Sequence, residues 1–190
     1  MKERADGSTA TWGDGPRRAL LLHGLSSNSQ GWWRLGPDLA SLGFTVVAPN
    51  LRGHGGSSLG DGLHLDGYRD DVLAIGTGWD VVLGHSLGGL LALACQLADP
   101  GFCAALVLED PALALAPTPE VVEWLVAEYA EPIDVEALSA ARPRWSEADV
   151  AAKVQALRAA GPHVVTGTIE ALGLVDVWSE LAAISIPTLL

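Results

Sequence analysis

The chain has 190 residues, of which 49% are hydrophobic and 18% are charged, so it is long enough for one globular domain with a sizeable core. Its 11 basic and 23 acidic residues give a formal net charge of −12, which argues against nucleic acids and anionic membranes as partners. No apolar run has the length of a membrane span, the first six residues do not resemble a signal peptide, and Cys95 and Cys103 lack a metal-binding or redox spacing. We therefore expect a cytoplasmic protein that uses no metal and no other cofactor.

Short apolar runs alternate with helical patterns through residues 18–108. The polar, glycine-rich residues 1–17 before them form either a loose lead-in or one short edge strand. Strands are then expected at 18–22, 44–48, 80–84 and 104–108, and helices at 32–41, 68–75 and 87–98. This alternation is typical of an α/β fold with a mostly parallel sheet and helices on both faces.

The pattern becomes helical after Pro111. A threonine–proline pair at 118–119 and a capping-box sequence at 146–149 indicate helix starts. The expected helices are 118–131, 146–161, 164–172 and 176–183. We therefore expect residues 1–111 to form an α/β core, residues 112–183 to form a helical insertion, and residues 184–190 to begin the next core strand.

Residues 84–88 have the sequence Gly-His-Ser-Leu-Gly, which fits the G-x-S-x-G pattern of a nucleophile elbow. In such an elbow a serine sits on a sharp turn between a buried strand and a helix, and the turn lifts its hydroxyl away from the sheet. Side chains two residues before and after the serine would crowd the turn, so glycine is favoured at both places. The pattern predicts that Ser86 is a nucleophile, with a plain glycine-rich turn as the alternative.

A second glycine-rich stretch, at residues 52–57, has some features of a phosphate-binding loop. It lacks the G-x-x-x-x-G-K-[ST] pattern, and more loop follows it instead of the start of a helix. We therefore expect no nucleotide-binding site there.

Four blocks of sequence, in this order, resemble the α/β-hydrolase family in its form with a helical cap. They are residues 21–25, 52–57, 84–89 and 184–190. The resemblance implies that Ser86 is the nucleophile and that the backbone N–H groups of Leu25 and Leu87 form the oxyanion hole. It implies a structural role for His23. A serine at this position also argues against the dehalogenases and epoxide hydrolases of the family, which use aspartate.

A serine hydroxyl needs a base, usually a histidine that is oriented by a carboxylate. The family has the chain order serine, acid, histidine, and the resemblance places the acid after the strand that begins at Ile184 and the histidine one strand later. We therefore expect the sequence to be the N-terminal and central part of a longer hydrolase, poorly stable and weakly active as an isolated chain. The alternative takes Asp110 or Glu109 as the acid and His163, the only histidine after Ser86, as the base.

These observations predict a serine hydrolase that cleaves an ester-like bond of a small, partly apolar substrate through an acyl-enzyme. Other activities on the same fold stay open, namely C–C bond hydrolysis, thioester hydrolysis and cofactor-free peroxidation. A non-catalytic ligand-binding protein is a further alternative, although a serine between two glycines argues against it. The sequence favours no oligomeric state.

Overall fold

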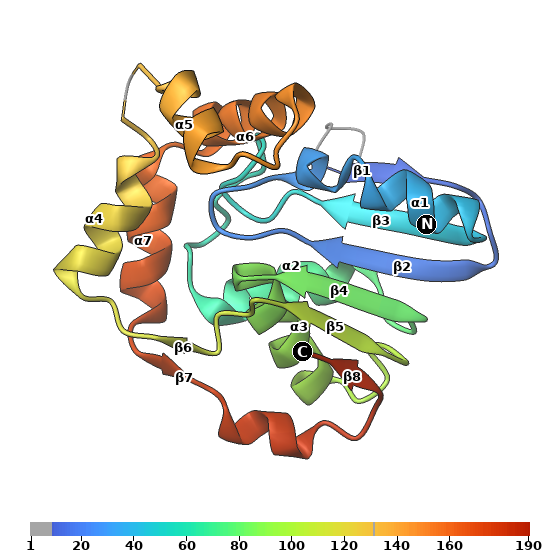
Figure 1. Ribbon diagram of the computed structural model, residues 1–190. Helices are drawn as coiled ribbons and strands as arrows, with labels where there is room; N and C mark the ends of the chain where they lie inside the picture. The colour runs from blue at the N-terminus through green and yellow to red at the C-terminus, as the bar shows by residue number, and fades with distance from the viewer. Residues whose placement is uncertain (1–8, 131) are drawn as a thin grey trace.

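The computed structural model of the protein describes residues 9–130 and 132–190, and Figure 1 shows one main sheet beside a group of helices. The sheet has the strand order β1-β3-β2-β4-β5-β8, and every neighbouring pair is parallel except β1 with β3. Its strands are β1 (Thr9–Trp12), β2 (Arg17–Leu22), β3 (Phe44–Pro49), β4 (Val81–His85), β5 (Leu106–Glu109) and β8 (Thr188–Leu189). The expected α/β fold with a mostly parallel sheet is confirmed.

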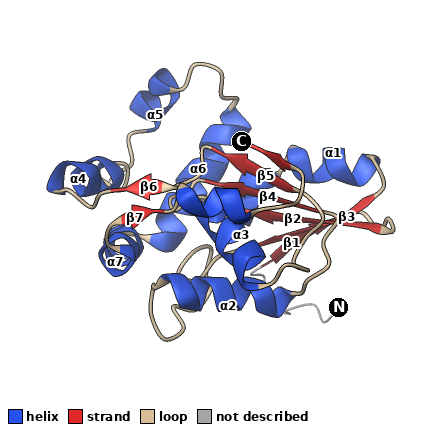
Figure 2. Ribbon diagram, turned by 90° about the horizontal axis from the view of Figure 1, so that it is seen from below, coloured by secondary structure: helices blue, strands red, loops and turns tan. Residues whose placement is uncertain are grey.

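Helices cover both faces of the sheet, because successive side chains of a strand point to opposite faces. The covering helices are α1 (Leu35–Ser41), α2 (Leu65–Ile75) and α3 (Leu87–Ala98). In β2, Ala19 and Leu21 pack on the side of α1, whereas Leu20 and Leu22 pack on the side of α2 and α3. Figure 2 shows α1 on one side of the sheet and the other two helices on the opposite side. This burial on both faces explains why the strand is apolar along its length.

Four further helices lie between β5 and β8 in the chain, and Figure 1 places them beyond the carboxyl ends of the parallel strands. We call α4 to α7 the helical region. Its members are α4 (Pro119–Ala127), α5 (Val135–Ala141), α6 (Glu147–Ala160) and α7 (Pro162–Leu172). Two short antiparallel strands, β6 (Ala114–Leu115) and β7 (Val175–Asp176), pair with each other, so the chain enters and leaves the helical region side by side.

Several elements differ from the expected ones. The helix expected at 32–41 is a 3-10 helix (Ser29–Trp32) followed by α1. Pro37 has no N–H to donate to the preceding turn, which favours a later start of the regular helix. The helix expected at 176–183 is β7 followed by a second 3-10 helix (Ser179–Ala183), and the strand expected at 184–190 is only β8.

The lead-in forms one edge strand, β1, although residues 1–8 of it lie outside the described residues, as does residue 131 near the expected end of the helix at 118–131. That helix, α4, already ends at Ala127, and α5 was not expected. Only Leu138 of α5 is buried. A helix with one buried residue needs no repeating apolar positions, so the sequence of α5 shows little helical periodicity. Across the described ranges, no helix has both the length and the apolar character that crossing a bilayer requires.

Candidate active site

Ser86 lies at the sharp turn between the end of β4 and the start of α3. Its backbone has φ 50° and ψ −115°, a left-handed conformation that residues other than glycine rarely adopt. A Cβ added at Gly84 would lie 2.2 Å from the carbonyl oxygen of Gly88, and one added at Gly88 would lie 2.1 Å from that of Leu22. The close packing of β2, β4 and α3 therefore holds Ser86 in the strained conformation that a nucleophile elbow requires.

Backbone N–H groups form hydrogen bonds with the Ser86 carbonyl oxygen, whereas the N–H of the next residue stays available. The Ser86 carbonyl oxygen accepts hydrogen bonds from the N–H groups of Gly89 at 3.0 Å, Leu90 at 3.2 Å and Ala112 at 3.1 Å. Within the described residues, the N–H of Leu87, at the first position of α3, donates to no acceptor. Such N–H groups at a helix N-terminus can stabilise negative charge that develops beside a nucleophile.

The loop of residues 23–27 follows β2 and carries the Leu25 N–H, which likewise donates to no acceptor in the described ranges. His23, at its start, is buried, and its Nε2 accepts a hydrogen bond from the Leu51 N–H at 3.0 Å. Its Nδ1 therefore carries the proton and donates to the carbonyl oxygen of Gly24 at 2.8 Å. Burial lowers the pKa of His23 to about 3, so the ring stays neutral. These contacts give His23 the means to hold the loop in place.

The next two carbonyl groups of this loop are held by side chains from other parts of the chain. His54 contacts the carbonyl oxygen of Leu25 through Nε2 and that of Arg52 through Nδ1, the latter at 2.9 Å. Burial lowers the pKa of His54. Lys153, on α6, donates from Nζ to the carbonyl oxygen of Ser26 at 2.9 Å. A neutral imidazole has a single N–H, so His54 donates to only one of its two carbonyl groups, whereas His23 and Lys153 donate to those of Gly24 and Ser26.

A pocket of about 590 Å³ lies between the loop 23–27, the carboxyl end of β4 and the helical region. Ser86, Leu25 and Asp110 line it from the core side. The lining from the helical region includes Trp124, Leu125, Glu128, Arg142, Trp145 and Lys153. The pocket can hold a small molecule near Ser86 and offers it both aromatic and charged contacts.

Asp110 follows β5 and shares the pocket with Ser86. Its φ of 41° makes it, with Ser86, one of the two described residues other than glycine with a positive φ. Glu109, the other carboxylate considered as an acid, does not line the pocket, and its carbonyl oxygen accepts the Ser86 N–H at 3.0 Å. The structure therefore brings Asp110, and not the Glu109 carboxylate, into the pocket with Ser86.

His163 is the second residue of α7 and is exposed, because that helix turns Val164 and Val165 to the interior. It does not line the Ser86 pocket, so the structure does not bring this candidate base together with the nucleophile. Among the described residues, His85 is the one histidine in the lining. It directly precedes Ser86 in the chain and packs beside Gly24, where an added Cβ would lie 2.7 Å from its Nδ1.

A charged group in the pocket wall was not anticipated from the sequence. The carboxylate of Glu128 pairs with Lys153 Nζ at 2.7 Å and with the guanidinium of Arg142. Burial alone would raise the pKa of Glu128, but the two cations outweigh it and hold this pKa below its usual value. Burial lowers the pKa of Lys153. The three residues come from separate segments, so only the tertiary fold brings them together.

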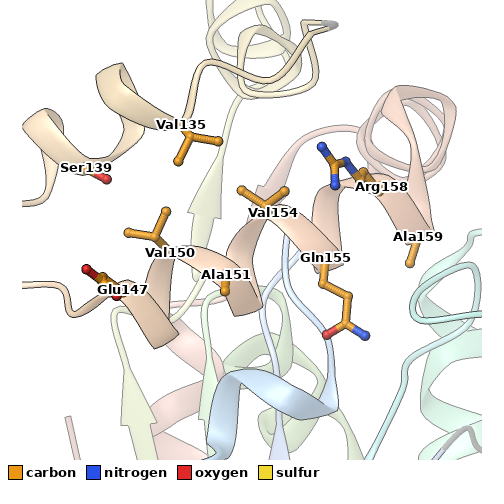
Figure 3. A pocket seen from close by; sticks show the side chains of 9 residues that line it. All are labelled: Val135, Ser139, Glu147, Val150, Ala151, Val154, Gln155, Arg158 and Ala159. Atoms are coloured by element: carbon orange, nitrogen blue, oxygen red, sulfur yellow. The ribbon is translucent and has the colours of Figure 1, made fainter.

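A second pocket, of about 670 Å³, lies on the helical region between α5 and α6. Figure 3 shows Val135 of α5 facing Val150 and Val154 of α6. Its described lining includes the hydroxyl of Ser139 but no histidine. This pocket is larger than the one at Ser86, yet none of its described lining residues lies on a strained turn, so it is the weaker candidate for catalysis.

The remaining candidate groups are metal-ligating side chains and the two thiols. In the described part of the chain, no three histidine, cysteine, aspartate or glutamate side chains are grouped so that they could hold a metal ion. Cys95 and Cys103 are free and buried, and burial raises their pKa values to about 12 and about 11. Both side chains therefore stay protonated thiols at neutral pH.

Comparison with known proteins concerns the family and the fold. Residues 19–190 match the model of a family described as the alpha/beta hydrolase family. Lipase LipV of Mycobacterium tuberculosis is 34% identical over 180 residues, which are 88% of this chain and 68% of the lipase. The structure of the N-formylmaleamic acid deformylase Nfo from Pseudomonas putida S16 has a TM-score of 0.77 and 24% identity, covering 95% of this chain and 75% of that one. The esterase EaEST from Exiguobacterium antarcticum also has a TM-score of 0.77, with 18% identity over 95% of this chain and 74% of that one.

Proposed function

The chain belongs to the alpha/beta hydrolase family, and from this membership we propose that it is a serine hydrolase of ester-like bonds in small, partly apolar substrates. The observation that carries the proposal is the strained turn at Ser86, which shares a pocket with Leu25 and the carboxylate of Asp110. The similarity to a mycobacterial lipase supports an ester as the substrate.

In the proposed reaction, Ser86 Oγ attacks the carbonyl carbon of the ester, and the carbonyl oxygen becomes an oxyanion. The N–H groups of Leu25 and Leu87 stabilise this oxyanion, and removing one such donor typically lowers the rate about 10²- to 10³-fold. The alcohol then leaves with a proton, and water releases the acid from the acyl-serine. Asp110 is the proposed acid of the triad because it shares the pocket with Ser86. The Ser86 proton has to pass to a base, and the test below measures whether one reaches it.

The pocket wall supports a partly apolar substrate. Trp124, Leu125 and Trp145 line it from the helical region, and Trp33 lines it from the segment before α1. The three indole rings offer large apolar contacts, and the indole N–H of Trp33 already donates to Asp149 at 3.1 Å. In this proposal the helical region acts as a cap that encloses the acyl or alcohol group next to Ser86.

The test is covalent labelling with a fluorophosphonate, followed by mass spectrometry to locate the adduct. We expect one adduct, on Ser86, and none in Ser86→Ala. Ser139→Ala is the matched control, because Ser139 lies in the other pocket without an elbow, and this variant should be labelled as fast as the unmodified protein. A folded protein without any adduct on Ser86, both alone and with added imidazole, would contradict the proposal.

A second arm of the experiment adds imidazole, which can act as a base in solution. If imidazole accelerates labelling of Ser86 at least about tenfold, the turn and the oxyanion donors are formed but no base is positioned beside them. If imidazole has no effect on fast labelling, a base already reaches Ser86. A panel of chromogenic esters of increasing acyl length, hydrolysed with and without imidazole, then defines the preferred substrate size.

A further inference from the structure

Lys153 links the helical region to the loop that carries Leu25. Its Nζ lies 2.9 Å from the carbonyl oxygen of Ser26, 2.7 Å from a carboxylate oxygen of Glu128, and next to Ser26 Oγ. The Ser26 hydroxyl in turn donates to the same carboxylate at 3.3 Å. An ammonium group has three protons, so these three partners use all of them. We call Lys153, Glu128 and Ser26 the lysine cluster.

Stability alone explains this cluster poorly. The Lys153 side chain is only 12% exposed, and taking an ammonium out of water is costly even when a carboxylate compensates it. Replacing such a pair by apolar side chains of similar size is often neutral or stabilising. The position of the ammonium, against the residue that directly follows Leu25, points to a role in the geometry of the loop.

Peptide planarity connects hydrogen bonds to the loop carbonyl groups with the position of the Leu25 N–H. Because each peptide group is planar, a bond to its carbonyl oxygen fixes the direction of the N–H on the same group. His23 holds the Gly24 carbonyl and thereby orients the Leu25 N–H. Without restraint on the following residues, however, the loop can still shift as a unit toward or away from Ser86.

We propose that Lys153 is a positioning residue, which holds the Ser26 carbonyl and thereby keeps the Leu25 N–H at the distance from Ser86 that the oxyanion needs. The inference rests on the proposed function. His54 contacts the Leu25 carbonyl oxygen from within the core, whereas Lys153 belongs to α6. The oxyanion hole is therefore complete only when the helical region is docked on the core.

A different role for this lysine, binding of an anionic substrate group, fits the pocket less well. The lining contains two cations, Arg142 and Lys153, and three carboxylates, those of Asp110, Glu128 and Asp149. The lining thus has no excess of positive charge, and the protons of Lys153 are already used within the lysine cluster.

The test measures two quantities in each variant: the rate of Ser86 labelling by a fluorophosphonate over a range of probe concentrations, and the hydrogen exchange of loop 23–27. Lys153→Met keeps the side-chain length but removes its donors. We expect its rate constant at saturating probe to fall about tenfold, with the half-saturating concentration within about twofold, because a misdirected donor costs less than a deleted one. Exchange in the loop should rise while exchange in α3 stays unchanged. Lys153→Arg, which can still donate to Ser26, should recover most of the rate.

Arg34→Met is the matched control. Arg34 makes another ionic contact between α6 and the core, with Asp149 at 2.8 Å and Ser146 at 2.9 Å, and its described contacts do not include the loop 23–27. We expect both measured quantities to stay within about twofold of the unmodified protein. If Lys153→Met does not fold, Glu128→Gln tests the same cluster, and we expect a smaller decrease in the labelling rate.

The outcomes separate this inference from the proposed function. Labelling of the unmodified protein together with unchanged labelling and exchange in Lys153→Met would overturn the positioning role and leave the function standing. Equal increases of exchange throughout α6 and α7 in Lys153→Met and Arg34→Met would make the role of Lys153 merely structural, which also overturns the inference. If Ser86 is unlabelled in the unmodified protein even with imidazole, the proposed function fails, and the positioning role fails with it.

Discussion

The α/β core and the helical region line the same pocket, but different interactions stabilise their contributions. In the core, the turn at Ser86 depends on backbone contacts and on α3, in which every residue from 87 to 93 is buried. In the helical region, α4 contains no buried residue, and Trp124 on it is 72% exposed. This region contacts the loop 23–27 in two ways: through the charged side chains of Lys153 and Glu128, and through an apolar cluster against which Leu25 packs.

In the proposed function, this difference separates the part that fixes the reaction geometry from the part that surrounds the substrate. Close-packed backbone permits almost no adjustment, so substitutions at the Ser86 turn should act on folding itself. Ionic contacts near solvent, such as the pair of Arg34 with Asp149, are weaker and depend on pH and salt, so substitutions there should change stability less. The predictions below test this division, beginning with the largest expected effect.

Gly88→Ala should have the largest effect on stability. Its Cβ would lie 2.1 Å from the carbonyl oxygen of Leu22 and 2.8 Å from that of His23, and backbone atoms of β2 cannot move aside without displacing the sheet from α3. We expect the free energy of unfolding, measured by urea denaturation, to fall by at least about 3 kcal/mol. If the variant is as stable as the unmodified protein, β2 and α3 can move apart to accommodate the added Cβ, and the prediction is wrong.

Gly101→Ala is the control for this prediction, because Gly101 follows the other end of α3. The nearest atom to an added Cβ there is a side-chain oxygen of Asp99 at 3.3 Å, and Gly101 does not have a positive φ. We expect its free energy of unfolding to change by less than about 0.5 kcal/mol. A loss as large as that of Gly88→Ala would mean that α3 is sensitive to any added methyl group, irrespective of the turn.

The buried histidines of the core give the second prediction, a loss of stability in mild acid. The pKa of His23 is lowered to about 3 in the folded protein, against an ordinary value of 6.5. Its contribution is therefore fully present above pH 6.5, and it decreases as the pH falls from 6.5 toward 3, because only the unfolded chain then binds the proton. Between pH 7.5 and 5.5 we expect the free energy of unfolding to fall by about 1.4 kcal/mol from this residue, measured by urea denaturation at each pH.

His54 shifts in the same direction, so the total decrease should be larger than that of one histidine. His23→Gln separates the two contributions, because glutamine can both accept from Leu51 and donate to Gly24. The variant should be less stable at pH 7.5, but its decrease between the two pH values should be smaller by about 1.4 kcal/mol. An unchanged decrease would show that His23 does not carry this pH dependence.

The sharp turn at Ser86 and the core strands could be predicted from the sequence because their signals are local. The Ser86 turn is encoded by five consecutive residues, and β2 is apolar because both faces of the sheet are covered. The pocket wall could not be predicted in the same way. Glu128, Arg142 and Lys153 meet only in the tertiary structure, and no sequence spacing links them.

The assignment of a base shows the same limit. His163 was a candidate because it is the only histidine after Ser86, and the chain order of a triad permits it. The order of residues along the chain does not determine where a side chain points, however. The first turn of α7 leaves the His163 side chain exposed. Asp110, by contrast, directly follows a core strand next to β4, so its place beside Ser86 follows from the strand order of the sheet.

The smallest effect is expected for Arg34→Met, the substitution that tests the ionic side of the comparison directly. The Arg34 side chain is 55% exposed where it pairs with Asp149, and such pairs typically contribute less than about 1 kcal/mol. We expect the free energy of unfolding to fall by no more than this in dilute buffer, and the difference from the unmodified protein to disappear in 1 M salt, where screening extends over about 3 Å. A salt-independent loss above about 2 kcal/mol would mean that the guanidinium anchors the helical region by packing. The Arg34 contact would then resemble the apolar packing of Leu25 against the helical region, and the distinction between packed and ionic contacts would fail at this site.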